Sequence, residues 1–121
     1  MKITDLIGET TEYEKKQAVE YKKVKSWLKS VSAFANTSGG TLIFGITDAD
    51  EVIGLKNVKS DSEFLSQKIK ERISPFLEIM MKIYKTERNQ ELLVLHIPSG
   101  SETPYYYIGD GMMEAYVRIG N

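Results

Sequence analysis

The chain has 121 residues, of which 41% are hydrophobic and 27% are charged, a composition that suits one soluble globular domain and argues against disorder. It contains no cysteine, which excludes disulfides, thiol catalysis and cysteine zinc sites. No apolar run approaches the roughly 20 residues that span a bilayer, and the first residues lack the basic-then-apolar order of a secretion signal, so we expect a cytoplasmic protein with no membrane partner. The formal net charge of −1 means that any attraction to nucleic acid has to come from a local basic patch.

The first predicted elements are a short helix or arm at residues 1–7, an edge strand over residues 11–16 and a helix over residues 19–36. The helix is indicated by apolar residues that recur every three or four positions and so share one face, namely Val24, Trp27, Leu28, Val31 and Ala35. Lys22, Lys25 and Lys29 fall on the opposite face. Those lysines form either a solvated helix surface or a face that contacts phosphates, and the sequence leaves both interpretations open.

A glycine corner and a buried strand follow this helix. Residues 36–40, Asn-Thr-Ser-Gly-Gly, either tolerate a left-handed backbone or bond their own main chain, so they predict that the helix stops there. Residues 41–46 are apolar and β-branched and predict a buried strand. An acidic turn at residues 48–51 leads to a short return strand at residues 52–54.

The second half of the chain predicts another helix, a hairpin and two further strands. Ser60 and Glu63 have the spacing of a capping box, with Ser60 as the N-cap, and this helix should end before Pro75. Residues 79–84 and 92–97 form a hairpin, and we interpret its single histidine, His96, as structural. The last two strands are predicted at residues 105–108 and 114–119.

Together these elements predict a single α+β domain over residues 1–121, with two main helices packed on a mixed, mostly antiparallel β-sheet. We expect the two helices and the strand after Gly40 to supply most of the buried apolar surface. Tyr105, Tyr106 and Tyr107 should point to alternating faces of their strand, so at least one is expected to be exposed, where it could stack on a base.

Several motifs resemble one known family. They are Gly8-Glu9 followed by Glu14, the AFAN run at residues 33–36 with its glycine pair, the strand LIFGIT with Asp48, and the YVRIG run at residues 116–120. Over residues 8–121 the pattern resembles the Schlafen-type AlbA-like domain, a family described as DNA-binding and often fused to further domains in bacterial regulators. The resemblance implies a DNA-binding domain of a Schlafen-like bacterial transcriptional regulator, and it allows this chain to be the N-terminal part of a longer protein.

If the domain binds nucleic acid, its cations should form a local strip that contacts phosphates, and we expect DNA in preference to RNA. The candidates are Lys15, Lys16, Lys22, Lys25, Lys29 and Arg118. A first alternative is a dimerisation or protein-interaction module, in which a homodimer forms through an edge strand or a helix face.

A second alternative is a metal-dependent endoribonuclease. Some Schlafen-type domains are described as using three acidic residues, and the matching positions here are Glu9, Glu14 and Asp48, with Asp50 as an alternative to Asp48. Such a cluster could hold Mg²⁺ or Mn²⁺, and without it no cofactor is expected. Five residues of straight strand span roughly 16 Å and put Glu9 and Glu14 on opposite faces, so their convergence requires a bend near Thr10.

Overall fold

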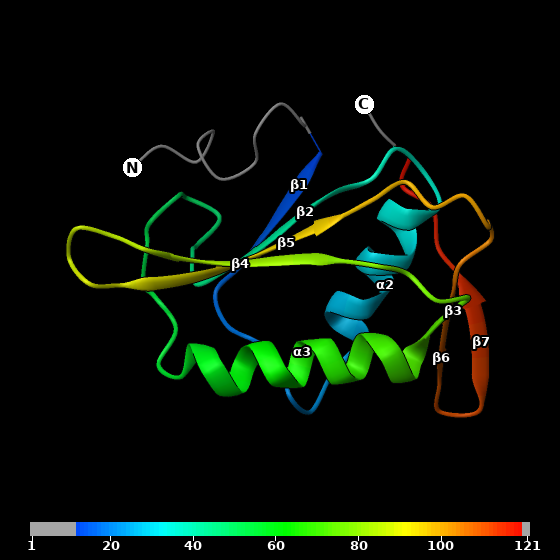
Figure 1. Cartoon of the computed structure of the whole chain (residues 1–121), viewed down its shortest axis with the longest axis horizontal. Helices are drawn as coiled ribbons and strands as arrows, with labels where there is room; N and C mark the ends of the chain where they lie inside the picture. Colours follow the sequence, from blue (N-terminus) through cyan, green and yellow to red (C-terminus); the bar gives the residue numbers. More distant parts are fainter. Residues whose placement is uncertain (1–11, 120–121) are drawn as a thin grey trace.

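The computed structural model describes residues 12–119, which form two β-sheets and two helices (Figure 1). The larger sheet has the strand order β1-β2-β5-β4 and the smaller one the order β3-β6-β7. Within this part of the chain β1 and β2 are parallel and the other strand pairs are antiparallel, so the predicted α+β fold with a mixed, mostly antiparallel sheet is confirmed. In chain order the elements are β1 (Tyr13–Lys16), α2 (Lys25–Ala35), β2 (Gly40–Phe44), α3 (Val58–Arg72), β3 (Ile73–Ser74), β4 (Met80–Lys85), β5 (Glu91–Ile97), β6 (Tyr106–Gly109) and β7 (Met112–Ala115).

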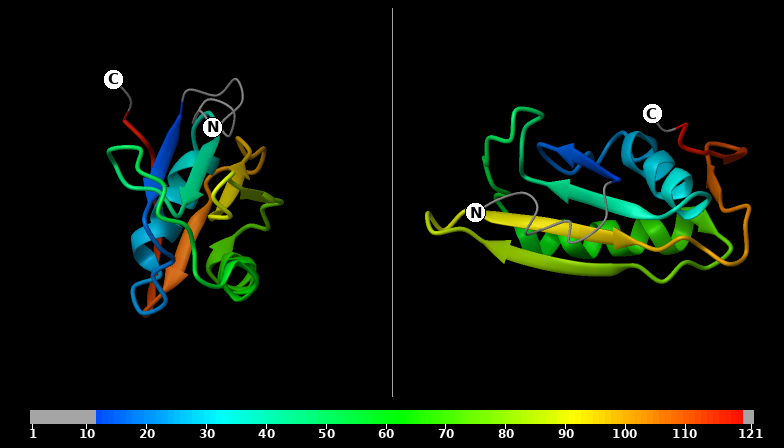
Figure 2. Two further views of the ribbon diagram at one scale, coloured as in Figure 1. Left: turned by 90° about the vertical axis from the view of Figure 1, so that its left-hand side faces the viewer. Right: turned by 90° about the horizontal axis from the view of Figure 1, so that it is seen from above.

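Both helices contribute to the core on one face of the larger sheet. Their buried side chains meet those of β2 and β5 in a cluster that includes Trp27, Val31, Leu42, Phe44, Leu65 and Leu95. The opposite face carries a smaller buried cluster of Ile43, Ile46, Leu92 and Val94. Both faces of β5 are therefore buried, which agrees with its continuous apolar sequence. Figure 2 shows α3 running along the same flank of the molecule as β4.

The predicted glycine corner connects α2 to β2, which lies inside the larger sheet. Gly39 has a φ of 80°, and a Cβ at this position would lie 2.8 Å from the Ile97 carbonyl oxygen, so a larger residue would be strained. All five residues of β2 are buried, as predicted. The strand ends at Phe44 rather than at residue 46, since the backbone turns at Gly45 with a φ of 105°. The expected return strand is reduced to a single bridge between Ile46 and Val52.

Helix α2 is shorter than predicted but buries the expected face. It begins at Lys25 rather than at residue 19, because the Glu20 carbonyl accepts a hydrogen bond from the Trp27 indole at 3.2 Å in place of a helical N–H. Lys22 therefore lies in the loop before the helix and not on its outer face. Eight of the eleven residues of α2 are buried, and Trp27 and Val31 have no exposed surface.

Helix α3 starts earlier and buries less than the sequence indicated. Its N-cap is Asn57, whose side chain accepts a hydrogen bond from the Ser60 N–H at 3.2 Å, so the prediction that Ser60 is the cap was wrong. It ends at Arg72, before Ser74-Pro75, as predicted. Its buried residues are Leu65 and Ile69, and β5 supplies the buried surface that we expected from this helix. No helix within residues 12–119 has the length and apolar character needed to cross a bilayer.

The last predicted strand is shifted. β7 begins at Met112 and ends at Ala115, and residues 116–119 run beside α2 instead of continuing in a sheet. The reason is that Ser32 of α2 and Asn36, the C-cap of α2, bond this backbone. Ser32 Oγ accepts a hydrogen bond from the Tyr116 N–H at 3.1 Å, and Asn36 Nδ2 donates to the Tyr116 carbonyl at 2.9 Å.

Candidate nucleic-acid interface

Glu14 on β1 connects three separate parts of the chain. Its Oε2 accepts a hydrogen bond from Ser30 Oγ of α2 at 2.7 Å, and its Oε1 accepts one from Arg118 Nη1 at 2.6 Å. Lys16 Nζ, two residues along the same strand, lies 3.8 Å from Glu14 Oε2. Glu14 therefore faces α2, and its carboxylate organises the cations around it.

Arg118 is held on several sides. Its Nε lies 3.5 Å from Glu12 Oε2, and its guanidinium lies 4.6 Å from the centre of the Phe34 ring. An aromatic face and two carboxylates fix the plane of a guanidinium more firmly than a single ion pair does. The side chain still keeps 30% of its surface exposed, so the guanidinium can be reached from solvent.

A pocket of 290 Å³ lies at this junction, and we call it the Glu14 pocket. It is lined by Glu14, Lys29, Ser30, Ala33 and residues 116–119. Lys29 is exposed and has no ion-pair partner within residues 12–119. Among the residues that the structure describes, Lys16, Lys29 and Arg118 thus outnumber Glu12 and Glu14 around the pocket, which gives it a small local excess of positive charge.

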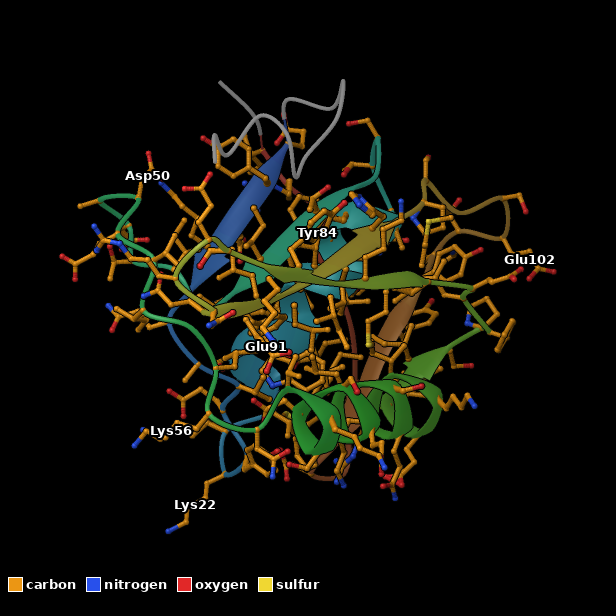
Figure 3. The ribbon with its side chains drawn as sticks, turned by 60° about the vertical axis from the view of Figure 1, so that its left-hand side comes forward. Lys22, Asp50, Lys56, Tyr84, Glu91 and Glu102 are labelled. Atoms are coloured by element: carbon orange, nitrogen blue, oxygen red, sulfur yellow. The ribbon has the colours of Figure 1, made fainter. Side chains whose placement is uncertain are left out.

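The other predicted cations lie elsewhere or are neutralised. Lys15 points to the opposite face of β1, where its Nζ lies 2.8 Å from Asp50 Oδ1 and donates to the Asp48 carbonyl; the hydrogen bond to Asp50 raises the pKa of Lys15. Lys25 lies 2.8 Å from Glu114 Oε1, and its hydrogen bonds to Glu114 and then to Tyr116 raise its pKa. Lys22 is exposed and projects from its loop in Figure 3.

The predicted acidic triad is only partly described. Glu9 lies outside the described residues. Asp48 and Asp50 occupy an exposed turn that Lys15 contacts, on the face of β1 opposite to Glu14. Within residues 12–119 no group of three or more His, Asp or Glu side chains could hold a metal ion. The metal cluster of Glu9, Glu14 and Asp48 stays a prediction.

Two polar residues that sequence reasoning missed support this interface. Asn36 Nδ2 donates to the carbonyls of Tyr105 and Tyr116, each at 2.9 Å, and Asn36 Oδ1 accepts from the Tyr105 N–H at 2.6 Å. Ser32, fully buried, donates to the same Tyr105 carbonyl at 2.8 Å. We call this pair the Ser32–Asn36 clamp. It fixes Tyr116 and so places Arg118, two residues later, over Phe34.

The signal for the clamp was present in the sequence. Ser32 lies on the buried side of α2, and Asn36 follows four residues later as its C-cap; polar side chains in such positions need hydrogen-bond partners. The tyrosines follow the expected alternation, since Tyr105 and Tyr107 are buried and Tyr106 is partly exposed. His96 lies 3.2 Å from Thr41 Oγ1, and burial, then the charge of Lys82, lowers its pKa.

The chain is similar to proteins that are named for nucleotide or DNA functions. It is 37% identical over 71 residues to an uncharacterized ATP-binding protein of Ureaplasma parvum serovar 3, and it spans 20% of that relative's length. Its fold matches the N-terminal domain of a protein from Nitrosomonas europaea that is named as related to RecG, an ATP-dependent DNA helicase. That match has a TM-score of 0.67 and 25% identity, and it covers 98% of this chain and 85% of the other. The model of the family Schlafen, AlbA_2 matches residues 9–121, and the chain therefore belongs to that family.

Proposed function

We propose that this chain is a nucleic-acid-binding domain that contacts phosphates around the Glu14 pocket. Lys29 and Arg118 at the pocket and Lys16 beside it supply the contacts, and Lys22 extends the surface along the loop before α2. The observation that carries the proposal is the fixed, partly exposed guanidinium of Arg118 next to the exposed ammonium of Lys29, which has no ion-pair partner among residues 12–119. A planar guanidinium carries several N–H donors that suit a phosphate, and a nearby lysine adds an adaptable point charge.

The proposed partner is DNA in preference to RNA. The solved neighbour comes from a protein named for a DNA helicase, and the family resemblance favours a DNA-binding part of a bacterial transcriptional regulator. Contacts of this kind position the protein on the phosphate backbone and do not read bases, so the binding should be weakly sequence-dependent.

Lys15 and Lys25 are given a smaller role in this proposal. Neither lines the Glu14 pocket, and each is bonded to a carboxylate, Asp50 or Glu114, that a phosphate would have to displace. Neutralising either lysine should therefore change the affinity less than neutralising Lys29.

The test is a fluorescence-anisotropy titration of labelled DNA and RNA duplexes at several salt concentrations. We expect wild-type protein to bind at low salt, and the double variant Lys29→Gln/Arg118→Gln to bind at least about tenfold more weakly, with a shallower dependence on salt. The matched control is Lys85→Gln/Arg88→Gln, which removes the same charges from the exposed β4–β5 hairpin. Absence of binding at low salt, or equal losses in both double variants, would refute the proposal.

The metal-dependent nuclease is not supported by the donors that the structure describes. Both carboxylate oxygens of Glu14 are bonded, one to Ser30 and one to Arg118, and Asp48 lies toward the other face of β1. We therefore derive no step through Mg²⁺ or Mn²⁺. The hypothesis depends on Glu9, and it is tested by incubating structured RNA with Mn²⁺ and either wild-type protein or Glu14→Ala. Equal cleavage by both proteins would remove Glu14 from any active site.

A further inference from the structure

Strand β4 presents an open edge. Within residues 12–119 it pairs with β5 alone, at the end of the larger sheet. The N–H of Thr86 donates to the Gln90 carbonyl at 2.8 Å, in the same register that places Lys85 opposite Glu91. Because bonded and non-bonded pairs alternate along an antiparallel ladder, the even-numbered residues of β4 bond β5. The N–H and C=O groups of Met81 and Ile83 therefore point to the open edge.

Several apolar side chains at or near this edge are exposed, beside the exposed Lys82 and Lys85. Phe76 is 69%, Met80 59% and Ile83 51% exposed. Exposed edge strands of soluble proteins usually carry charges, prolines or bulges that discourage pairing, whereas the large apolar side chains of Met80 and Ile83, on the two faces of β4, favour association. Lys82 is the charge nearest the middle of the strand.

A groove separates the β4 edge from α3. Two adjoining hollows of 500 and 240 Å³ share Ser66, Lys70 and Met81 in their lining, and the second hollow extends to Phe76 and Ile79. Figure 1 shows α3 running beside β4. The helix side of the groove is a polar stripe formed by Glu63, Ser66, Gln67 and Lys70.

The polar stripe is complementary to itself. Glu63 and Lys70 stand two helical turns apart on the same side of α3, and neither has an ion-pair partner within residues 12–119. If two copies of α3 lie antiparallel, Glu63 of each copy faces Lys70 of the other. A parallel arrangement would place like charges together.

We propose that a second copy of this chain docks on this flank, with the two β4 strands antiparallel about a two-fold axis at Met81. Residues opposite each other in antiparallel strands point to the same face, so odd-numbered residues must face odd-numbered ones. Centred on Met81, the pairing places Ile79 opposite Ile83 of the second copy, and Met80 opposite its Lys82. Centred on Lys82, it would bring the two lysines together.

A single two-fold axis can relate both the β4 strands and the α3 helices of the two copies. Met81 lines the groove beside Ser66 and Gln67, the middle of the polar stripe, so one two-fold axis can pass close to both. The two larger sheets would then join into one continuous sheet. Since β1 and β4 are opposite edges, the Glu14 pockets would remain free at the two ends.

The first test is sedimentation analysis of the wild-type chain over a wide range of concentration. We expect the average mass to rise from the monomer value of 13.7 kDa toward twice that value. Ile83→Lys, which places a charge at the pairing edge, should keep the protein monomeric. A mass that stays at the monomer value at every concentration would overturn the proposal.

The second test separates this interface from any other mode of dimerisation. Glu63→Lys and Lys70→Glu should each weaken self-association about tenfold, because both symmetry-related ion pairs become repulsive. A mixture of the two variants should form heterodimers at least as well as wild type, since every Lys then faces a Glu. Lys56→Glu, a charge reversal on a loop outside the groove, is the control. Wild-type association of both single variants, or a mixture that associates no better than either variant alone, would contradict the proposed docking.

Discussion

The two edges of the larger sheet are built in different ways. At the β1 edge, carboxylates, cations and hydroxyls from β1, α2 and residues 116–119 bond one another, and eight of the eleven residues of α2 are buried behind them. At the β4 edge, α3 buries two residues, and apolar side chains reach solvent beside a strand that has β5 as its one partner among residues 12–119. The comparison indicates that a fixed polar site needs a deeply buried helix for support, whereas an open apolar edge suits association.

The largest expected effect is loss of the Ser32–Asn36 clamp. Asn36→Ala removes three hydrogen bonds to the backbones of Tyr105 and Tyr116, leaves partly buried backbone groups unpaired, and should lower the free energy of unfolding by about 3 kcal/mol. On α3, Glu71→Ala also removes hydrogen bonds, to Gln67 and Lys68, but these are exposed, so we expect almost no loss of stability. Chemical denaturation measures both, and equal losses would contradict the contrast between the helices.

The glycine corner between α2 and β2 should be the next most sensitive position. Gly39→Ala combines a left-handed backbone with a Cβ 2.8 Å from the Ile97 carbonyl oxygen, so it should cost about 2–3 kcal/mol. Gly111→Ala is a matched control, because its φ of 76° is similar but no atom lies within 4 Å of the added Cβ. It should cost about 1 kcal/mol. Similar unfolding free energies for the two variants would mean that the close approach at the corner is unimportant.

Glu14→Gln separates stability from binding at the β1 edge. The variant keeps the shape of the side chain but removes the charge that faces Arg118 and Lys16, and it should reduce stability by about 1 kcal/mol. The same change frees both cations, so DNA affinity should increase about three- to tenfold at low salt. A decrease in affinity would instead mean that Glu14 is needed to position Arg118 for binding.

The smallest effect concerns His96, on β5 between the two edges. Burial, and then Lys82, holds its pKa below the ordinary value of 6.5. The unfolded chain therefore takes up this proton more readily, so the contribution of His96 to stability is present above about pH 6.5 and is lost as the pH falls through the lowered pKa. His96→Gln should remove this part of the pH dependence in denaturation curves. A wild-type curve that is no steeper than that of the variant in this range would contradict the assignment.

The sequence was most informative where neighbouring residues determine the structure. The spacing of Trp27, Leu28 and Val31 predicted the buried face of α2, and the residue types at positions 36–40 predicted the corner before β2, where Gly39 has a left-handed backbone. The start of α2 was misjudged because the Glu20 carbonyl bonds an indole seven residues away, which helical periodicity does not encode. The capping-box spacing of Ser60 and Glu63 placed the start of α3 too late, because Asn57, an equally good cap, stands three residues earlier and accepts from the Ser60 N–H.

The candidate interface was predictable only in part, since its contacts are remote in sequence. Glu14 and Arg118 were both singled out, but their ion pair joins positions 104 residues apart. The alternation along β1 could have shown that Lys15 and Lys16 point to opposite faces. In the sequence, the polar stripe on α3 looks like an ordinary solvated helix surface. The structure adds that it lies beside Met81 and the open edge of β4.

Backbone amide chemical shifts, followed as a short DNA duplex is added at low salt, test the central claim most directly. The account predicts that the shifts concentrate in β1, on the exposed residues from Lys22 to Lys29, and at residues 116–119, and that they fade as salt is added. It also predicts little change in β4 and α3. Chemical-shift changes centred on β4 and α3, or no changes at either edge of the sheet, would contradict the proposed DNA-binding site.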